Sequence, residues 1–303
     1  MESIIVSKSR RAYLLRIGDL VSLLMVSSLF LSISSVLMLY LSFRLFGVAL
    51  KPILLCAMFL VVYSVYSLNR LTDQEEDAIN APERSIFVEG NERFLLAVAI
   101  VSYIAALVLG WIESPFAALI LLFPIITGIA YSKNIFSAVG IPRLKEIFLV
   151  KSLVVASSWA VCAAFLPVLY LSGNFIKLGF IFPFFFIKMF INTALFDVRD
   201  VEGDTLNDVK TIPVVIGIKR TRQVLLILQS LLVVWLVLFS EIFSEYCVIL
   251  TVSMIYGYLY ILYFCNKNDH GKMSWDVLVD GEWIIMSVGV WIYSGIDSYL
   301  AFI

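Results

Sequence analysis

The feature that most constrains this chain is a series of apolar runs, each long enough for a helix to cross a lipid bilayer. A spanning helix needs about 20 mostly apolar residues. Of the 303 residues, 61% are hydrophobic and 15% are charged, whereas soluble domains are about half apolar and about a quarter charged. The runs cover residues 19–42, 50–68, 94–112, 114–131, 147–171, 174–196, 222–240, 245–264 and 283–302. Their uninterrupted length excludes a membrane barrel, whose strands are short and alternating. The sequence therefore predicts an all-α polytopic membrane protein with about nine transmembrane helices around a central cavity.

Basic residues are spread unevenly over the segments that join these runs. Four precede the first run, and most of the others lie in or beside residues 69–93, 132–146, 197–221 and 265–282. The remaining connections hold only Arg44, Lys51 and Lys177. Lys and Arg accumulate on the cytoplasmic side of membrane proteins. The distribution predicts an N-in/C-out topology in the cell membrane, with the long polar segments and any active site on the cytoplasmic side.

Charge and cysteine usage exclude several classes of partner. The net charge is −1 and no basic stripe or arm is present, so nucleic acid is not an expected partner. The four cysteines are scattered singly through apolar segments, a pattern typical of packing residues and not of disulfides or zinc ligands. No segment indicates an obligate protein partner.

Two acidic motifs follow directly after apolar runs. The first holds Asp73 and Asp77, and the second holds Asp200 and Asp204. Within each motif the aspartates are four residues apart, which places them on one helix face. Each aspartate lies 127 positions before its counterpart. We interpret this as the trace of a duplication inside one domain, residues 1–303. It would comprise four-helix units at about 19–131 and 147–264 and a last helix at 283–302.

The doubled arrangement predicts a site for a metal ion and a phosphate group. Like charges four residues apart destabilise a helix unless something neutralises them. Mg²⁺ prefers oxygen ligands and usually shares a substrate phosphate with the protein. A diphosphate also needs cations, and arginine can bind it with two hydrogen bonds. Four basic residues flank the motifs and fit this role, although each alone is also typical of a cytoplasmic anchor: Arg84, Lys145, Lys151 and Lys210.

The neighbourhood of each acidic pair extends the pattern. Asn69, Asp73, Asp77, Asn80, Pro82 and Arg84 fit the motif NDxxDxxxDxxNxPxRP. Asp197, Asp200, Glu202, Gly203, Asp204, Thr211 and Pro213 fit DxxDxEGDxxxxxxTLP, with Ile212 in place of leucine. The chain thus resembles the UbiA superfamily of intramembrane prenyltransferases. Tyr131 and the region of Lys145, with Lys151 beyond it, resemble that family's third conserved loop. Arg70 and Ser85 depart from the pattern, where the family has aspartate and proline.

The resemblance implies a role for each matching residue. Mg²⁺ and the diphosphate would be held by the catalytic set Asn69, Asp73, Asp77, Asp200 and Asp204. Asp197 would assist the metal or orient the acceptor. Phosphate oxygens would be bound by Arg84, Lys145 and Lys210, with Lys151 and Tyr131 as further candidates. The implied reaction moves an isoprenyl chain from its diphosphate to a lipophilic acceptor, often an aromatic quinone precursor, and releases pyrophosphate.

Two polar residues interrupt the sixth apolar run. Lys188 and Asn192 are four residues apart and therefore share a helix face. Polar and ionisable groups at membrane depth usually face a cavity or a partner. We expect both to line the acceptor or prenyl cavity, although a lysine here can also extend to the membrane interface.

Two other functions remain as alternatives. An ion-coupled transporter also uses buried carboxylates and internal repeats, but its site is expected at the membrane midplane, whereas these acids follow helix ends. A CDP-alcohol phosphotransferase-like enzyme is also metal-dependent. Its expected DGxxAR stretch is not matched by residues 77–80.

Overall fold

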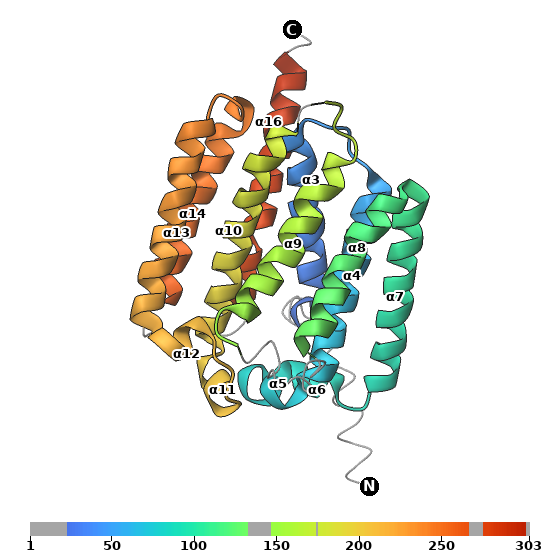
Figure 1. The fold of residues 1–303 in the computed structure, drawn as a ribbon, viewed down its shortest axis with the longest axis vertical. Helices are drawn as coiled ribbons and strands as arrows, with labels where there is room; N and C mark the ends of the chain where they lie inside the picture. The colour runs from blue at the N-terminus through green and yellow to red at the C-terminus, as the bar shows by residue number, and fades with distance from the viewer. Residues whose placement is uncertain (1–22, 133–146, 174, 267–274, 301–303) are drawn as a thin grey trace.

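The computed structural model describes residues 23–132, 147–173, 175–266 and 275–300, and this part of the chain is helical without strands. Nine long helices run side by side as a bundle (Figure 1). They are α3 (Leu29–Phe46), α4 (Pro52–Thr72), α7 (Glu92–Glu113), α8 (Pro115–Ser132), α9 (Val150–Val168), α10 (Ile176–Arg199), α13 (Ile218–Phe239), α14 (Cys247–Phe264) and α16 (Glu282–Leu300).

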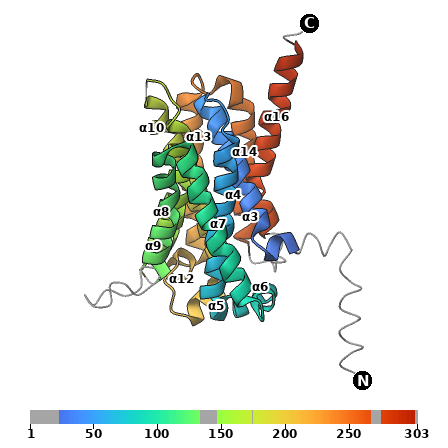
Figure 2. The ribbon, with the colours of Figure 1, turned by 90° about the vertical axis from the view of Figure 1, so that its right-hand side faces the viewer.

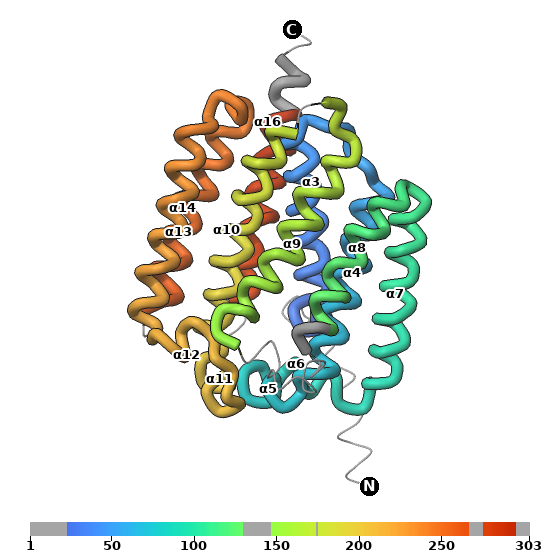
Figure 3. Tube along the Cα trace, in the orientation of Figure 1, coloured from blue at the N-terminus to red at the C-terminus, as the bar shows by residue number. Residues whose placement is uncertain are grey.

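Short helices join the long ones. They are α5 (Gln74–Asn80), α6 (Pro82–Val88), α11 (Val201–Leu206), α12 (Ile212–Ile216), the 3₁₀ turn η3 (Ser244–Tyr246) and the π turn η4 (Asp276–Asp280). Helices α5, α6, α11 and α12 gather at one end of the bundle, as Figure 1 and the view at right angles in Figure 2 both show. The trace in Figure 3 follows α4 into α5 and α10 into α11 at this end. We call it the polar end.

The prediction of an all-α membrane protein is confirmed. Eight helices among the described residues are long and apolar enough to cross a membrane, and the shorter apolar stretch of α8 accompanies them. Helix boundaries differ from the predicted runs by a few residues in most cases, and two differences affect the architecture. The first long helix begins at Leu29, because Ser28 before it adopts a left-handed conformation with φ of 67°. The segments 69–93 and 197–221 are not open loops, since Pro82 and Pro213 occupy the first turns of α6 and α12, where proline favours a helix start.

Small residues and buried hydroxyl groups hold the long helices together. Ala156, Ala160 and Ala163 on α9 are fully buried and allow a neighbouring backbone to approach closely. Ser42 donates to the carbonyl oxygen of Ala163 at 2.5 Å, which joins α3 to α9. Ser64 donates to the carbonyl oxygen of Ala99 at 2.7 Å, which joins α4 to α7. Such contacts replace the hydrophobic driving force that is missing between helices in lipid.

One ion pair is buried among α10, α14 and α16. Lys188 Nζ lies 2.5 Å from Glu282 Oε1, and both side chains are almost fully buried. Ser253 and Tyr260, both on α14, also donate hydrogen bonds to Glu282. Lys188 was expected to line a substrate cavity. It does not line either of the two cavities described below, and Glu282 holds its ammonium group.

Candidate active site

A cavity of about 190 Å³ lies at the polar end, where α4, α9, α10 and η4 meet the short helices. Its polar lining combines carboxylates, amides and cations. These side chains are Asn69, Arg70, Asp73, Asp77, Arg84, Lys151, Asn192, Thr193, Asp197, Arg199, Asp200, Asp276 and Asp280. Segments more than 200 residues apart in the chain therefore contribute to one polar chamber.

The two acidic motifs have the same local backbone structure. Asp73 ends α4 and begins α5, and its amide donates to the carbonyl four residues back at 2.8 Å. Asp200 occupies the same place between α10 and α11, with the corresponding distance 3.0 Å. Asp77 and Asp204 each follow one turn later, and their amides donate to Asp73 and Asp200 at 2.8 and 2.9 Å. In each motif, the first aspartate thus marks the junction of a long helix with a short one.

Three of these four aspartates line the cavity, and the fourth lies just behind it. Asp204 is 1% exposed and is absent from the lining. Lys151 connects it to the cavity, because Lys151 Nζ lies 3.4 Å from Asp204 Oδ2 and 2.9 Å from Asp197 Oδ1. Ser152 donates to the other oxygen of Asp197 at 2.9 Å.

The motif helices α5 and α11 are joined directly. The amide of Gly203 donates to Asn80 Oδ1 at 3.1 Å. A Cβ atom at position 203 would lie 2.2 Å from that oxygen, so only glycine allows this approach. Asn80 and Gly203 belong to the two sequence motifs, and their contact explains why these residue types occur there.

The protonation of the carboxylates reflects burial and the nearest cations. Burial raises the pKa of Asp77 to about 6, against the opposing charges of Arg84 and Arg70. Burial also raises the pKa of Asp204 to about 6, against the opposing charge of Lys151. For Asp200 the same effect of burial is outweighed by the charge and hydrogen bonds of Arg199, so its pKa is lowered. The site therefore contains two carboxylates that titrate near neutral pH and one that stays ionised.

Two arginines in the cavity share one carboxylate. Arg199 binds both oxygens of Asp200, at 2.7 and 2.9 Å. A further nitrogen of Arg199 donates to Asp276 at 3.0 Å. Arg84 contacts both oxygens of Asp276 at 3.0 Å. Arg70 also lines the cavity and donates to the carbonyl oxygen of Met25 at 3.1 Å.

The remaining predicted site residues differ in where they lie. Asn192 lines the cavity, and its role toward the acceptor or the prenyl chain stays a prediction. Lys210 is exposed between α11 and α12 and does not line the cavity. Lys145 lies outside the described residues. Tyr131 belongs to α8, but its side chain is outside the description.

Several cavity residues were not among the predicted site residues, and three of them are charged groups with a recognisable sequence signal. Arg199 is adjacent to Asp200 in the second motif, which is a signal that could have identified it. Asp276 and Asp280 carry the same four-residue spacing as the two acidic motifs, and that repeated spacing could have identified them as well. The π turn that carries them is of a kind often found at functional sites.

The donor set fits Mg²⁺ bound together with a phosphate group. Asn69, Asp73, Asp77, Asp197 and Asp200 present oxygen atoms to the cavity, and hard cations prefer oxygen. Within the described residues no three His, Cys, Asp or Glu side chains are gathered closely enough to hold an ion alone. Mg²⁺ commonly uses one or two carboxylates and completes its ligand shell with water and substrate phosphate. The arrangement fits a metal ion whose ligand shell is completed by water and an anionic substrate.

Comparison with known sequences identifies the family to which most of the chain belongs. The model of the UbiA prenyltransferase family matches residues 28–276. The digeranylgeranylglyceryl phosphate synthase of Methanosphaera stadtmanae is 26% identical over 214 residues, which cover 69% of this chain and 74% of the relative. The enzymes of the same name from Sulfurisphaera tokodaii and Saccharolobus solfataricus are each 29% identical. They are matched over 58% and 64% of their own lengths and cover 56% and 61% of this chain.

Solved structures share the fold. A UbiA homolog from Archaeoglobus fulgidus, bound to GPP and Mg²⁺, superposes with a TM-score of 0.62 at 15% identity. The match covers 89% of this chain and 99% of that structure. The same homolog bound to DMAPP and Mg²⁺ gives a TM-score of 0.58 at 16% identity, over 88% and 98% of the two chains.

Proposed function

Because the chain is a membrane prenyltransferase of the UbiA prenyltransferase family, we propose that it transfers an isoprenyl chain from a prenyl diphosphate to a lipophilic acceptor. The reaction would depend on Mg²⁺ and release pyrophosphate. One observation carries the proposal. Two aspartate motifs, 127 positions apart, meet at a single cavity with cations at the end of an apolar helix bundle.

The metal would be held by residues of the two motifs. Asn69, Asp73 and Asp77 belong to the first motif, and Asp197, Asp200 and Asp204 to the second. Asp197 and Asp204 also contact Lys151. When bound, Mg²⁺ would stabilise the negative charge that develops on the departing diphosphate. The carboxylate of Asp204 contacts Lys151, so it would act as a ligand once this lysine moves to the phosphate.

The diphosphate would be bound by the cations of the cavity. Arg84, Lys151 and Arg199 all line it, and each is held by a carboxylate. An incoming diphosphate offers these groups stronger acceptors and can replace the carboxylates, since hydrogen bonds between charged groups are the strong ones. Lys145, Lys210 and Tyr131 remain proposed phosphate contacts on the basis of the family motifs alone.

The bundle would protect the allylic carbon once its bond to oxygen weakens. Asn192 and Phe196 lie on the part of the cavity wall that continues along α10 toward the membrane interior. Phe196 also contacts the guanidinium of Arg199, 4.7 Å from its ring centre. Apolar and aromatic walls exclude water, which would otherwise capture the prenyl group.

Two classes of acceptor are candidates. An aromatic, quinone-precursor-like ring follows from the family motifs. A glyceryl phosphate lipid follows from the similarity to digeranylgeranylglyceryl phosphate synthases, whose name includes such a group. Either class would enter from the bilayer. We also propose that the polar end and its cavity face the cytoplasm, with the N-terminus on that side and the C-terminus on the other, because basic residues concentrate there.

The test uses the purified protein in lipid nanodiscs with prenyl diphosphates of several lengths. Each donor is offered with an aromatic acceptor or with a prenylated glyceryl phosphate, with Mg²⁺ or with EDTA. The expected result is a prenylated acceptor and pyrophosphate, detected by mass spectrometry, in Mg²⁺ and not in EDTA. Asp73→Asn serves as the matched inactive variant. Product formation that is equal with and without divalent metal would contradict the proposal, as would ion flux in liposomes without any transfer.

A further inference from the structure

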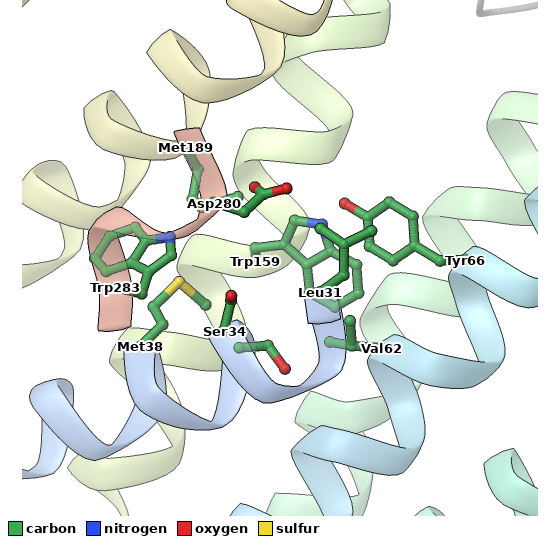
Figure 4. A pocket seen from close by; sticks show the side chains of 10 residues that line it. Leu31, Ser34, Met38, Val62, Tyr66, Trp159, Met189, Asp280 and Trp283 are labelled. Atoms are coloured by element: carbon green, nitrogen blue, oxygen red, sulfur yellow. The ribbon is translucent and has the colours of Figure 1, made fainter. Parts of the chain in front are cut away.

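A second cavity, of about 30 Å³, lies deeper in the bundle beside the main one. Its lining comes from residues located further into the same helices, such as Val62 on α4 and Trp159 on α9. Leu31, Tyr66 and Asp280 line both cavities, so the two spaces are adjacent. Figure 4 shows the smaller one from close by.

Two buried oxygen atoms in this small cavity have no hydrogen-bond partner. They are Ser34 Oγ and Asp280 Oδ2, on side chains of residues that are 2% and 4% exposed. A buried polar atom without a partner is unfavourable, and native proteins rarely leave one unsatisfied. Both atoms belong to residues that line the same space, so one polar group placed there could satisfy both.

Contacts of Asp280 with its neighbours fix the position of its carboxylate at the small cavity. Asn192 donates to its other oxygen, Oδ1, at 2.9 Å. Asp280 also ends the π turn η4, and the next residue, Gly281, has no room for a Cβ atom, which would lie 2.0 Å from the carbonyl oxygen of Val277. In Figure 4 the carboxylate of Asp280 and the hydroxyl of Tyr66 point toward each other across the cavity.

The residues that line the small cavity determine which chemical group it can bind. Asp280 Oδ2 accepts a hydrogen bond, so the guest must donate one. A phosphate or carboxylate would be repelled by Asp280, and an ammonium group carries three donors for only two free oxygens. Ser35 also lines the cavity, but its hydroxyl donates to the carbonyl oxygen of Ser32 at 2.7 Å. The other walls are mostly apolar or aromatic: Met38, Val62, Trp159, Met189 and Trp283. About 30 Å³ admits only a group of a few atoms, so a hydroxyl attached to hydrocarbon fits best.

We propose that Ser34 and Asp280 bind the hydroxyl group of a lipophilic acceptor, and that Asp280 is the catalytic base of the transfer. This inference rests on the proposed function. The acceptor oxygen forms a bond to C1 of the prenyl group, while the bond from C1 to the diphosphate breaks and its electron pair leaves with the diphosphate. The hydroxyl proton moves to Asp280 Oδ2, and the product is an ether. Because Asp280 also lines the main cavity, the proton can then pass to the released pyrophosphate.

The test separates the acceptor from the donor. Asp280→Asn keeps the size of the side chain but removes the base, so single-turnover transfer to a lipophilic alcohol should fall about 100-fold or more. Its affinity for the prenyl diphosphate in Mg²⁺, measured by binding, should stay within about twofold of wild type. Ser34→Ala should raise the KM for the acceptor several-fold and leave donor affinity unchanged. Asp276→Asn, on the same π turn, should instead change donor affinity.

Three results would overturn the inference. Transfer near the wild-type rate by Asp280→Asn, with no effect of Ser34→Ala, would mean that the small cavity holds only water. Equal loss of donor binding and transfer in Asp280→Asn would assign Asp280 to the donor or to folding. Attachment of the prenyl group only to ring carbon atoms would exclude the ether-forming step. Failure of the wild-type protein to transfer any donor to any acceptor would instead count against the proposed function itself.

Discussion

The amide of Gly203 donates a hydrogen bond to the side chain of Asn80, which places the short helices of the two acidic motifs in direct contact. Both aspartate pairs depend on this contact for their position, because α5 carries Asp77 and α11 carries Asp204. The cavity is thus shaped by a contact in which neither partner is charged.

Gly203→Ala should disturb the cavity through this contact. The added methyl group would lie 2.2 Å from Asn80 Oδ1, so α5 and α11 must separate, at a cost of about 1–3 kcal/mol. Thermal unfolding in detergent and transfer activity should both decline. Gly179→Ala on α10 is the control, since nothing lies within 4 Å of its added Cβ. When Asn80→Ala is already present, adding Gly203→Ala should reduce the melting temperature and transfer activity little further. An unchanged melting temperature for Gly203→Ala would contradict the assigned contact.

Binding of Mg²⁺ with the donor should weaken as the pH falls through about 6. Burial raises the pKa of both Asp77 and Asp204 to about 6, so acidification protonates ligands that the metal needs. The stability of the metal-free protein should change in the opposite direction. A carboxyl group whose pKa is raised on folding stabilises the folded state most at low pH, and this contribution is lost as the pH rises through 6. Donor affinity in Mg²⁺ and melting temperature in EDTA, measured from pH 5 to 8, test both slopes. If donor affinity and melting temperature changed with pH in the same direction, these two carboxylates would not control donor binding.

Metal-ligand and phosphate-binding residues should separate in kinetics. Asp73→Asn and Asp204→Asn should each reduce turnover about 100-fold or more, the scale typical of losing one group that stabilises developing charge, with little loss of folding. Arg84→Ala removes a charged hydrogen-bond donor and should weaken donor binding about 10-fold to 100-fold. The Mg²⁺ concentration that gives half-maximal activity should change less in Arg84→Ala than in the aspartate variants. Near-wild-type turnover of Asp73→Asn would remove Asp73 from the metal site.

Removing one partner of the buried pair Lys188 and Glu282 should destabilise the protein far more than replacing both partners. Lys188→Met leaves Glu282 buried without its cation and should cost about 3–5 kcal/mol, detected as reduced thermal stability in detergent. The double variant Lys188→Met with Glu282→Met should recover most of that loss, because two apolar side chains replace the pair. Lys51→Met is the control. Lys51 pairs with Glu113 at 2.9 Å with its side chain 35% exposed, and such pairs contribute about 0–1 kcal/mol. Equal losses at the two sites would contradict this account.

Much of the fold could be predicted from the sequence because lipid restricts the choice of structure. A backbone in hydrocarbon must satisfy its own hydrogen bonds, so a run such as 94–112 can hardly be anything but a helix, and α7 covers it. The segments 69–93 and 197–221 lie outside this constraint. Their short helices depend on contacts such as that of Gly203 with Asn80, which connect positions more than 100 residues apart. The duplication of four-helix units remains a prediction.

The candidate site was only partly predictable for a related reason. Spacing predicts which side chains share a helix face, and it led to Asp73, Asp77 and Asp200, all of which line the cavity. It does not predict which partner a side chain will meet on another helix. Lys188 had the right depth and face, but Glu282 lies opposite it on α16.

Asp276 and Asp280 occupy the two ends of one five-residue π turn, and they face different neighbours. Asp276 binds Arg84 and Arg199, whereas Asp280 faces the small cavity. An anion that captures the two guanidinium groups would leave Asp276, at one end of the turn, without its ion pairs. A single turn of chain would thereby sense both substrates. The expected consequence is a compulsory order of binding, in which the diphosphate binds first and the acceptor binds second.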